Sequence, residues 1–114
     1  MKVKHLDAKL VNCRIKEDLL SDEYFVKEVL DDIVKKLKMT FIDKVSHKFN
    51  PRGLSVLYLI AESHIAIHTW PELKLVDLEI VTCKDESDVF DGLKIVVERF
   101  KAEKVETNYW EYTY

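Results

Sequence analysis

The stretch that decides the fold is residues 54–83, which run LSVLYLIAESHIAIHTWPELKLVDLEIVTC. Its first part, Leu54 to Ile60, is a nearly continuous apolar run, which predicts a well-buried strand. Residues 61–70 and 73–83 place apolar side chains on alternate positions, so two further strands are expected. The links between these segments are short, which indicates that neighbouring strands run antiparallel.

Strands are also expected on both sides of this block. Residues 4–11 carry apolar side chains at alternate positions, and a further strand is predicted over Thr40 to Phe49. The run Asn50 to Gly53 predicts a turn, because proline fixes one φ angle and glycine permits the other. The tail after Val105 predicts a final strand that gathers several aromatic side chains on one face.

Two helices are expected between the strands. The apolar residues from Val26 to Leu37 recur at helical spacing, and Ser21 offers a capping hydroxyl for the start of this helix. A second helix with one apolar face is predicted over Glu86 to Glu103. Gly92 lies inside this second helix, at a cost of roughly 1 kcal/mol relative to alanine.

The order of these elements predicts an α+β fold. We expect a two-layer α/β sandwich, with a mostly antiparallel sheet and both helices on one face. A chain of 114 residues fits a single domain, residues 1–114. The second face of such a sheet has no helix to cover it, and the tail adds aromatic side chains. Pairing of this face with another copy, in a homodimer, is therefore expected.

Composition and charge restrict the possible functions. Apolar residues make up 47% of the chain, and the net charge is −3 with acidic and basic residues interspersed. A nucleic-acid or anionic-membrane partner would need a basic face, so neither is expected. No apolar leader or spanning segment is visible, so the expected compartment is the cytoplasm, where Cys13 and Cys83 stay reduced. Cys13 is expected to be a small buried hydrophobic residue.

Residues that can carry chemistry are concentrated between His47 and Cys83. His64 and His68 have a spacing that could bind a metal, but a tetrahedral zinc site needs four ligands, and only His47 and Cys83 could complete it. No metal is therefore expected. Ser63 has histidines nearby, as in a nucleophilic triad, but the Gly-x-Ser-x-Gly turn is missing. Taken singly, each of these residues is more often structural.

Taken together, these residues form a longer pattern. Residues 62–72 are ESHIAIHTWPE, residues 47–55 are HKFNPRGLS, and Asp77 and the pair Thr82–Cys83 follow. In these blocks the chain resembles the short, pyruvoyl-dependent S-adenosylmethionine decarboxylases of bacteria and archaea, which begin as proenzymes. The resemblance implies decarboxylation of S-adenosylmethionine, which yields the aminopropyl donor for polyamine and spermidine synthesis.

The resemblance also implies that the chain cuts itself. The Ser63 hydroxyl would attack the Glu62 carbonyl, converting the amide to an ester, and elimination would release residues 1–62. Residue 63 would then become a pyruvoyl group, the covalent cofactor, at the start of residues 63–114. This group would form a Schiff base with the substrate amine and accept electrons as CO₂ leaves. Such an attack requires a strained backbone at the serine.

Three further roles in the chemistry follow from the same resemblance. Ser55 would help to stabilise the oxyanion formed during cleavage. His68 would be the base that removes the Cα proton of the ester. Cys83 would protonate the substrate carbon after decarboxylation, so its thiol is expected to face the histidine.

The resemblance also assigns the substrate contacts. Phe49 and Trp70 would hold the adenine by stacking, and Glu72 would bind the ribose hydroxyls. One alternative keeps the pyruvoyl group but acts on arginine or ornithine, which offer no adenine for the aromatic pair to stack on. A second alternative is a non-catalytic, processing-dead paralogue, although all the residues that carry the chemistry are present.

Overall fold

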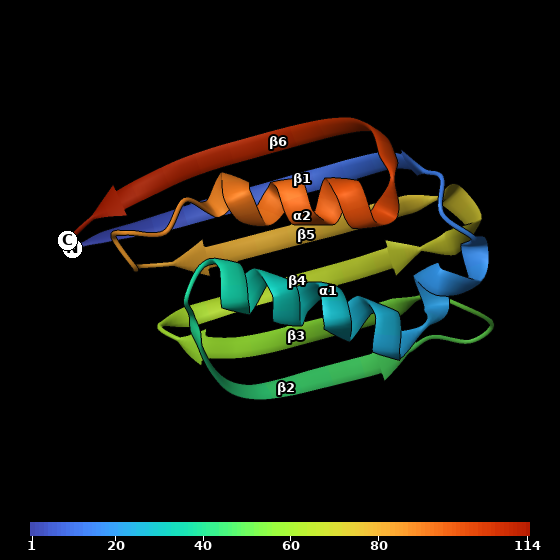
Figure 1. The fold of residues 1–114 in the computed structure, drawn as a ribbon, viewed down its shortest axis with the longest axis horizontal. Coiled ribbons are helices and arrows are strands. Elements are labelled where there is room, and N and C mark those ends of the chain that lie inside the picture. The colour runs from blue at the N-terminus through green and yellow to red at the C-terminus, as the bar shows by residue number, and fades with distance from the viewer.

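A six-stranded antiparallel sheet with two helices on one face makes up the computed structural model, which describes residues 1–114 (Figure 1). The strands are β1 (Lys2–Cys13), β2 (Thr40–Lys48), β3 (Leu54–Ala61), β4 (Ser63–Trp70), β5 (Leu75–Thr82) and β6 (Ala102–Thr113). The helices are α1 (Glu23–Lys36) and α2 (Val89–Phe100). The strand order is β2-β3-β4-β5-β1-β6, and the predicted α+β sandwich is confirmed.

Strands β3, β4 and β5 form a meander in the middle of the sheet. Glu62 alone links β3 to β4, and a short 3₁₀ turn, Pro71–Leu73, followed by Lys74, links β4 to β5. Links this short hold neighbouring strands antiparallel and fix their register. The meander therefore decides which side chains of the central strands lie next to one another.

The cap of helix α1 lies one residue later than predicted, at Asp22 instead of Ser21. The Asp22 side chain, not that of Ser21, accepts the free backbone N–H groups of Tyr24 and Phe25, at 2.9 and 3.2 Å. The Ser21 hydroxyl instead accepts the backbone N–H of Gly53, at 3.1 Å. A carboxylate is as effective a cap as a hydroxyl, and the tertiary contact to the β2–β3 turn uses the serine.

Helix α2 is shorter than the predicted Glu86 to Glu103. It begins after Asp88, whose side chain accepts the Phe90 backbone N–H, and ends at Phe100, because the next residue, Lys101, has a left-handed φ of 52°. Gly92 lies where α2 approaches the rest of the core, because a Cβ there would be only 2.8 Å from Cδ1 of Ile80. The glycine thus permits close packing. Neither helix combines the length and apolar character needed to cross a membrane.

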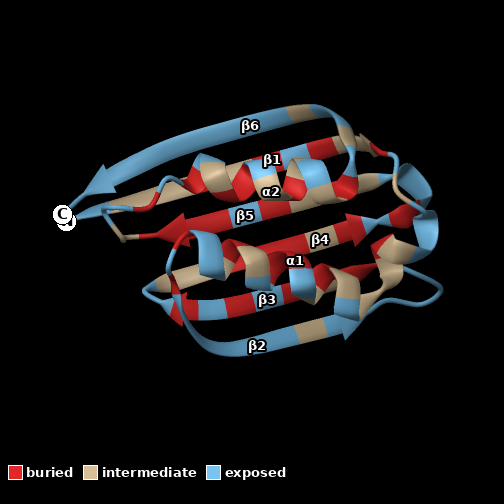
Figure 2. Ribbon diagram, viewed as in Figure 1, coloured by how far each residue is buried: buried red, intermediate tan, exposed pale blue.

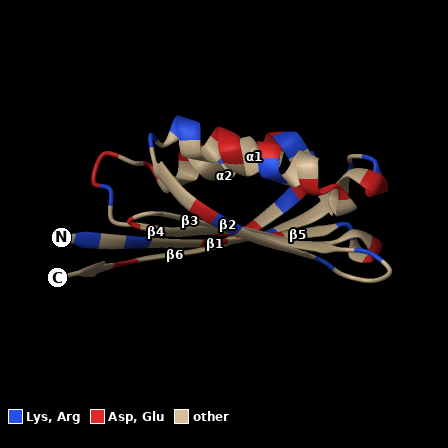
Figure 3. Cartoon of the chain, turned by 90° about the horizontal axis from the view of Figure 1, so that it is seen from below, with Lys and Arg blue, Asp and Glu red and all other residues tan.

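The core lies between the helices and one face of the sheet (Figures 2 and 3). In β3, Val56 and Tyr58 are buried in this core, whereas Leu57 and Leu59 are 39% and 52% exposed on the other face. The prediction of a well-buried β3 was therefore wrong for half of its residues. Side chains alternate between the two faces of a strand, and only one face is covered by helices.

Gly92→Ala is expected to destabilise the protein, although alanine is the better helix former. The new methyl group would overlap Cδ1 of buried Ile80 and press on Ile33 Cγ2 at 3.3 Å. Overpacking costs about 1–3 kcal/mol and the helix gain is about 1 kcal/mol, so a net loss of about 1 kcal/mol is expected. Urea unfolding would measure it. A more stable variant would show that α2 can move away from Ile80 of β5 at no cost.

Candidate active site

The open face is the side of the sheet opposite α1 and α2 (Figure 3). Because Ile65 and Ile67 are buried in the core, the alternate residues His64 and His68 of β4 point to the open face. Strand pairing places Ser55 of β3 and Asp77 of β5 on either side of His68. The sequence-predicted chemistry is thus concentrated on the face that no helix covers.

A pocket of about 210 Å³ lies at the end of β4 that carries Trp70. Its lining includes five residues singled out in the sequence: Phe49, Ser55, His68, Trp70 and Glu72. Ser55 Oγ and His68 Nδ1 are 2.7 Å apart, within hydrogen-bond distance. Phe49 and Trp70 are 48% and 40% exposed, so both rings retain surface on which a flat ligand could stack.

The opposite end of β4 holds Ser63 in an unusual conformation. Its φ angle is 126°, a region that residues with a Cβ rarely adopt and that stores strain. Cβ lies about 120° from the carbonyl carbon around a tetrahedral Cα, so here it is almost eclipsed with the acyl carbon of Glu62. The serine side chain is therefore turned toward its own preceding carbonyl, as the expected cleavage requires.

Two other groups meet at this end of β4. The Cys83 thiol is 3.7 Å from the backbone carbonyl oxygen of Glu62, to which it can donate. The Ser63 hydroxyl is 3.2 Å from Nδ1 of His64, whose Nε2 is 2.7 Å from a carboxylate oxygen of Glu79. Sequence reasoning did not single out Glu79. Its alternation with apolar residues put it on the open face, but its contact with His64 depends on strand pairing.

The chain separates the expected site residues into two groups. Ser63 and His68 are five residues apart on an extended strand, which corresponds to about 16 Å. Within one chain, His68 thus lies beside Ser55 and not beside Ser63. Cys83 likewise lies at Glu62, so the expectation that it faces His68 is not met within a single chain.

Two titratable groups on these strands have shifted pKa values. Burial, and then the charge of Glu62, raise the pKa of the Cys83 thiol, which favours its protonated form. Burial, and then repulsion by Asp7, raise the pKa of Asp77 from 3.8 to about 6. Cys13, in contrast, is fully buried in the core, as predicted, and burial raises its pKa to about 11.

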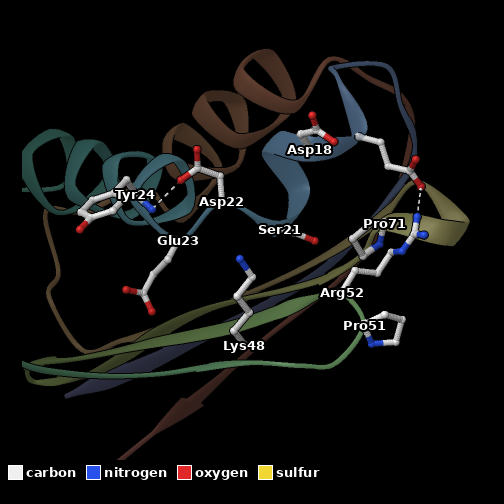
Figure 4. Close-up of a pocket in the computed structure, with 10 residues that line it drawn as sticks. Asp18, Ser21, Asp22, Glu23, Tyr24, Lys48, Pro51, Arg52 and Pro71 are labelled. Carbon is white, nitrogen blue, oxygen red and sulfur yellow. Dashed lines mark hydrogen bonds and ion pairs between the residues drawn. The ribbon is translucent and has the colours of Figure 1, made fainter.

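A larger cavity of about 680 Å³ lies on the helix side, around the start of α1 (Figure 4). Its lining is mostly charged. Arg52 binds Glu17 at 2.9 Å, and the Ser21 hydroxyl is held by the Gly53 backbone. Lys48 points from the sheet toward the beginning of α1. This cavity lacks an activated nucleophile, so the open face is the better candidate for the chemistry.

The histidines that could have shared a metal are dispersed. His47 packs against Phe49, with ring centroids 4.7 Å apart, while His64 and His68 bond to Glu79 and Ser55. The structure brings together no group of three or more His, Cys, Asp or Glu side chains that could hold a metal ion. These imidazoles instead serve as partners for hydroxyl and carboxylate groups.

Comparison with known proteins gives a consistent result. The sequence profile of S-adenosylmethionine decarboxylase matches residues 4–111. A protein named S-adenosylmethionine decarboxylase proenzyme from Archaeoglobus fulgidus is 42% identical over 100 residues, or 88% of each chain. One of the same name from Syntrophomonas wolfei is 35% identical over 99 residues, which cover 87% of this chain and 77% of that protein.

A solved structure is similar as well. The crystal structure of the adenosylmethionine decarboxylase from Aquifex aeolicus superposes with a TM-score of 0.85 and 27% sequence identity. The superposition covers 95% of this chain and 88% of the other. The resemblance therefore extends over the whole sheet and both helices, not only over residues 62–72.

Asp77→Asn is expected to stabilise the fold at neutral pH. The pKa of Asp77 is raised in the folded chain, to about 6, so the folded state loses stability as this carboxyl ionises between about pH 4 and pH 6. Because the group is half-exposed, solvent screening reduces the expected gain in the free energy of unfolding to about 1 kcal/mol. Urea unfolding at pH 7.5 and at about pH 3.5 measures this gain. At the lower pH no gain is expected, because Asp77 is then protonated in both the folded and the unfolded chain.

Glu106→Gln, which removes another carboxylate from the open face, is the matched control for this measurement. An Asp77→Asn variant equally stabilised at both pH values would contradict the ionisation account.

Proposed function

The chain belongs to the S-adenosylmethionine decarboxylase family, and from this premise we propose that it decarboxylates S-adenosylmethionine after cleaving itself between Glu62 and Ser63. The φ angle of Ser63 is the observation that carries the proposal, because it places the Cβ that bears the hydroxyl beside the acyl carbon of Glu62. The product would serve as an aminopropyl donor in polyamine synthesis. Names of the relatives include the word proenzyme, which agrees with self-cleavage.

Cleavage can be followed atom by atom. The Ser63 oxygen adds to the acyl carbon of Glu62, the carbon–nitrogen bond breaks, and the nitrogen gains a proton, so that an ester replaces the amide. A base then removes the Cα proton of residue 63, and the Glu62 carboxylate leaves with residues 1–62. The dehydroalanine left behind becomes an imine and reacts with water, losing ammonia, to give a ketone at the start of residues 63–114.

The surroundings of Ser63 suit the pyruvoyl group that this sequence of steps would leave. That ketone supplies an electron sink for decarboxylation. The Glu62 carbonyl and the Cys83 thiol already contact each other at 3.7 Å. The raised pKa of Cys83 keeps its thiol protonated, which a proton donor to carbon requires. We therefore assign Cys83 as the donor.

The pocket with Ser55 and His68 supports S-adenosylmethionine as the substrate. Phe49 and Trp70 form its aromatic walls and Glu72 its carboxylate. An adenine can stack on the aromatic side chains, and a carboxylate can accept hydrogen bonds from ribose hydroxyls. Arginine or ornithine would leave these aromatic walls without a partner, which disfavours the alternative substrates.

A homodimer would unite the two halves of the site. Ser63 and His68 lie at opposite ends of β4, and the Ser63 hydroxyl approaches His64 on the open face. If two copies pack open face to open face about a twofold axis that crosses β4, Ser63 of each copy meets the His68 end of the other. The open face also exposes large apolar side chains for such a contact: Val45, Leu57, Leu59, Trp70, Trp110 and Tyr112.

The proposed function also bears on the partners of the chain and on its compartment. Self-cleavage in a homodimer requires no nucleic acid or membrane as partner. We place the activity in the cytoplasm, because two unpaired thiols, Cys13 and Cys83, suit a reducing compartment.

Ser63→Ala is expected to abolish cleavage and decarboxylation together, because no hydroxyl remains to attack Glu62 or to become the ketone. Intact mass of the purified wild-type protein should show two chains, 1–62 and 63–114, the second reducible by borohydride. Release of CO₂ from carboxyl-labelled S-adenosylmethionine, arginine and ornithine then identifies the substrate. Ser46→Ala, on the helix side of β2, is the control. A wild-type chain that stays whole would contradict the proposal.

Co-expression tests the homodimer. Ser63→Ala and His68→Ala chains should each remain whole when expressed alone. When they are expressed together, His68 of the first chain should act on Ser63 of the second, so that only the His68→Ala chain is cleaved. Tags of different mass distinguish the two chains. A monomeric protein, or a mixture in which neither chain is cleaved, would show that the site is not shared between copies.

A further inference from the structure

We propose that His64, held by Glu79, is the base that takes the proton from the Ser63 hydroxyl as it attacks the Glu62 carbonyl. This inference rests on the proposed self-cleavage and adds a catalytic residue to its first step. It is distinct from the role of His68, which is expected to act in the later elimination of the ester.

The contact between Ser63 and His64 is not an ordinary neighbour contact. Successive side chains of a regular strand point to opposite faces of the sheet. The φ of Ser63 is 126°, unlike the negative φ of a regular strand residue, and the Ser63 Oγ lies 3.2 Å from Nδ1 of His64. The same backbone angle thus turns the serine toward its target carbonyl and toward an imidazole.

The bond to Glu79 determines which nitrogen of His64 can act as a base. Nε2 is 2.7 Å from a Glu79 carboxylate oxygen, which can only accept, so Nε2 carries the proton. In the neutral imidazole Nδ1 is then the unprotonated nitrogen, and it faces the Ser63 hydroxyl, as a base must. Glu79 acts as a positioning residue, because it touches the imidazole and not the reacting atoms.

The other histidine of β4 cannot take this role in the same chain. His68 lies about 16 Å along the strand, and its Nδ1 is 2.7 Å from Ser55. The arrangement of hydroxyl, imidazole and carboxylate at Ser63, His64 and Glu79 is that of a nucleophile with an oriented base. In the acyl shift, Nδ1 takes the hydroxyl proton while the new carbon–oxygen bond forms. The protonated imidazole then returns a proton to the departing Ser63 nitrogen.

The test follows the appearance of residues 1–62 by intact mass, starting from freshly refolded chains. His64→Ala is expected to slow cleavage by about 10²-fold or more, the usual loss when a general base is removed. Added imidazole should restore part of the rate. Glu79→Leu should slow cleavage more than Glu79→Gln, whose side-chain oxygen can still accept the Nε2 proton. The matched controls are His5→Ala on β1, two strands away from His64, and Glu106→Gln on β6, at the far end of the sheet.

Hydroxylamine separates the two histidines, because it cuts esters and leaves amides intact. A His68→Ala chain should accumulate the ester and be cut by hydroxylamine between residues 62 and 63. A His64→Ala chain should resist hydroxylamine, because its amide has not been converted. Thermal unfolding reports whether each variant folds. If His64→Ala does not fold, Glu79→Leu provides the test.

The outcomes distinguish this inference from the proposed function. If the wild-type chain does not cleave, the proposed function fails. If the wild-type chain cleaves and the folded His64 variants cleave at the same rate, or accumulate the ester as His68→Ala does, only the role of His64 is overturned.

Discussion

The register of β4 between β3 and β5 is the constraint on which the site depends. It sets Ser55 and Asp77 opposite His68 at one end of the strand, and Thr82, which precedes Cys83, opposite Ser63 at the other. A slip of one residue would move every side chain of β4 to the other face. The one-residue link at Glu62 and the short turn at Pro71–Leu73 prevent such a slip.

Stability and chemistry are assigned to different faces of the same sheet. Helices α1 and α2 cover one face, where Gly92 lets α2 pack closely against Ile80 of the sheet and Ile33 of α1. The other face keeps polar and aromatic side chains accessible, including Trp70 and Asp77. Because a strand alternates its side chains, the residues of β4 can supply both layers, and the strained Ser63 is held in place by a well-packed core beneath it.

Much of the fold was predictable because its signals are local. Helical spacing in α1, alternation in β5 and the turn around Pro51 and Gly53 each predicted the element that the structure has. The errors have tertiary causes. Ser21 was expected to cap α1, but the β2–β3 turn binds its hydroxyl. Strand β3 was expected to be buried on both sides, but nothing in one chain covers Leu57 and Leu59.

The sequence by itself determined the family and predicted the cleavage point and the residue types of the site, because these lie in three short blocks of the chain, residues 47–55, 62–72 and 77–83. Only the tertiary structure decided how they are grouped. It placed His68 with Ser55, far from Ser63, and it placed Glu79 beside His64. Such pairings depend on strand register and on one backbone angle, and both are set by contacts between residues distant in sequence, which no local pattern records.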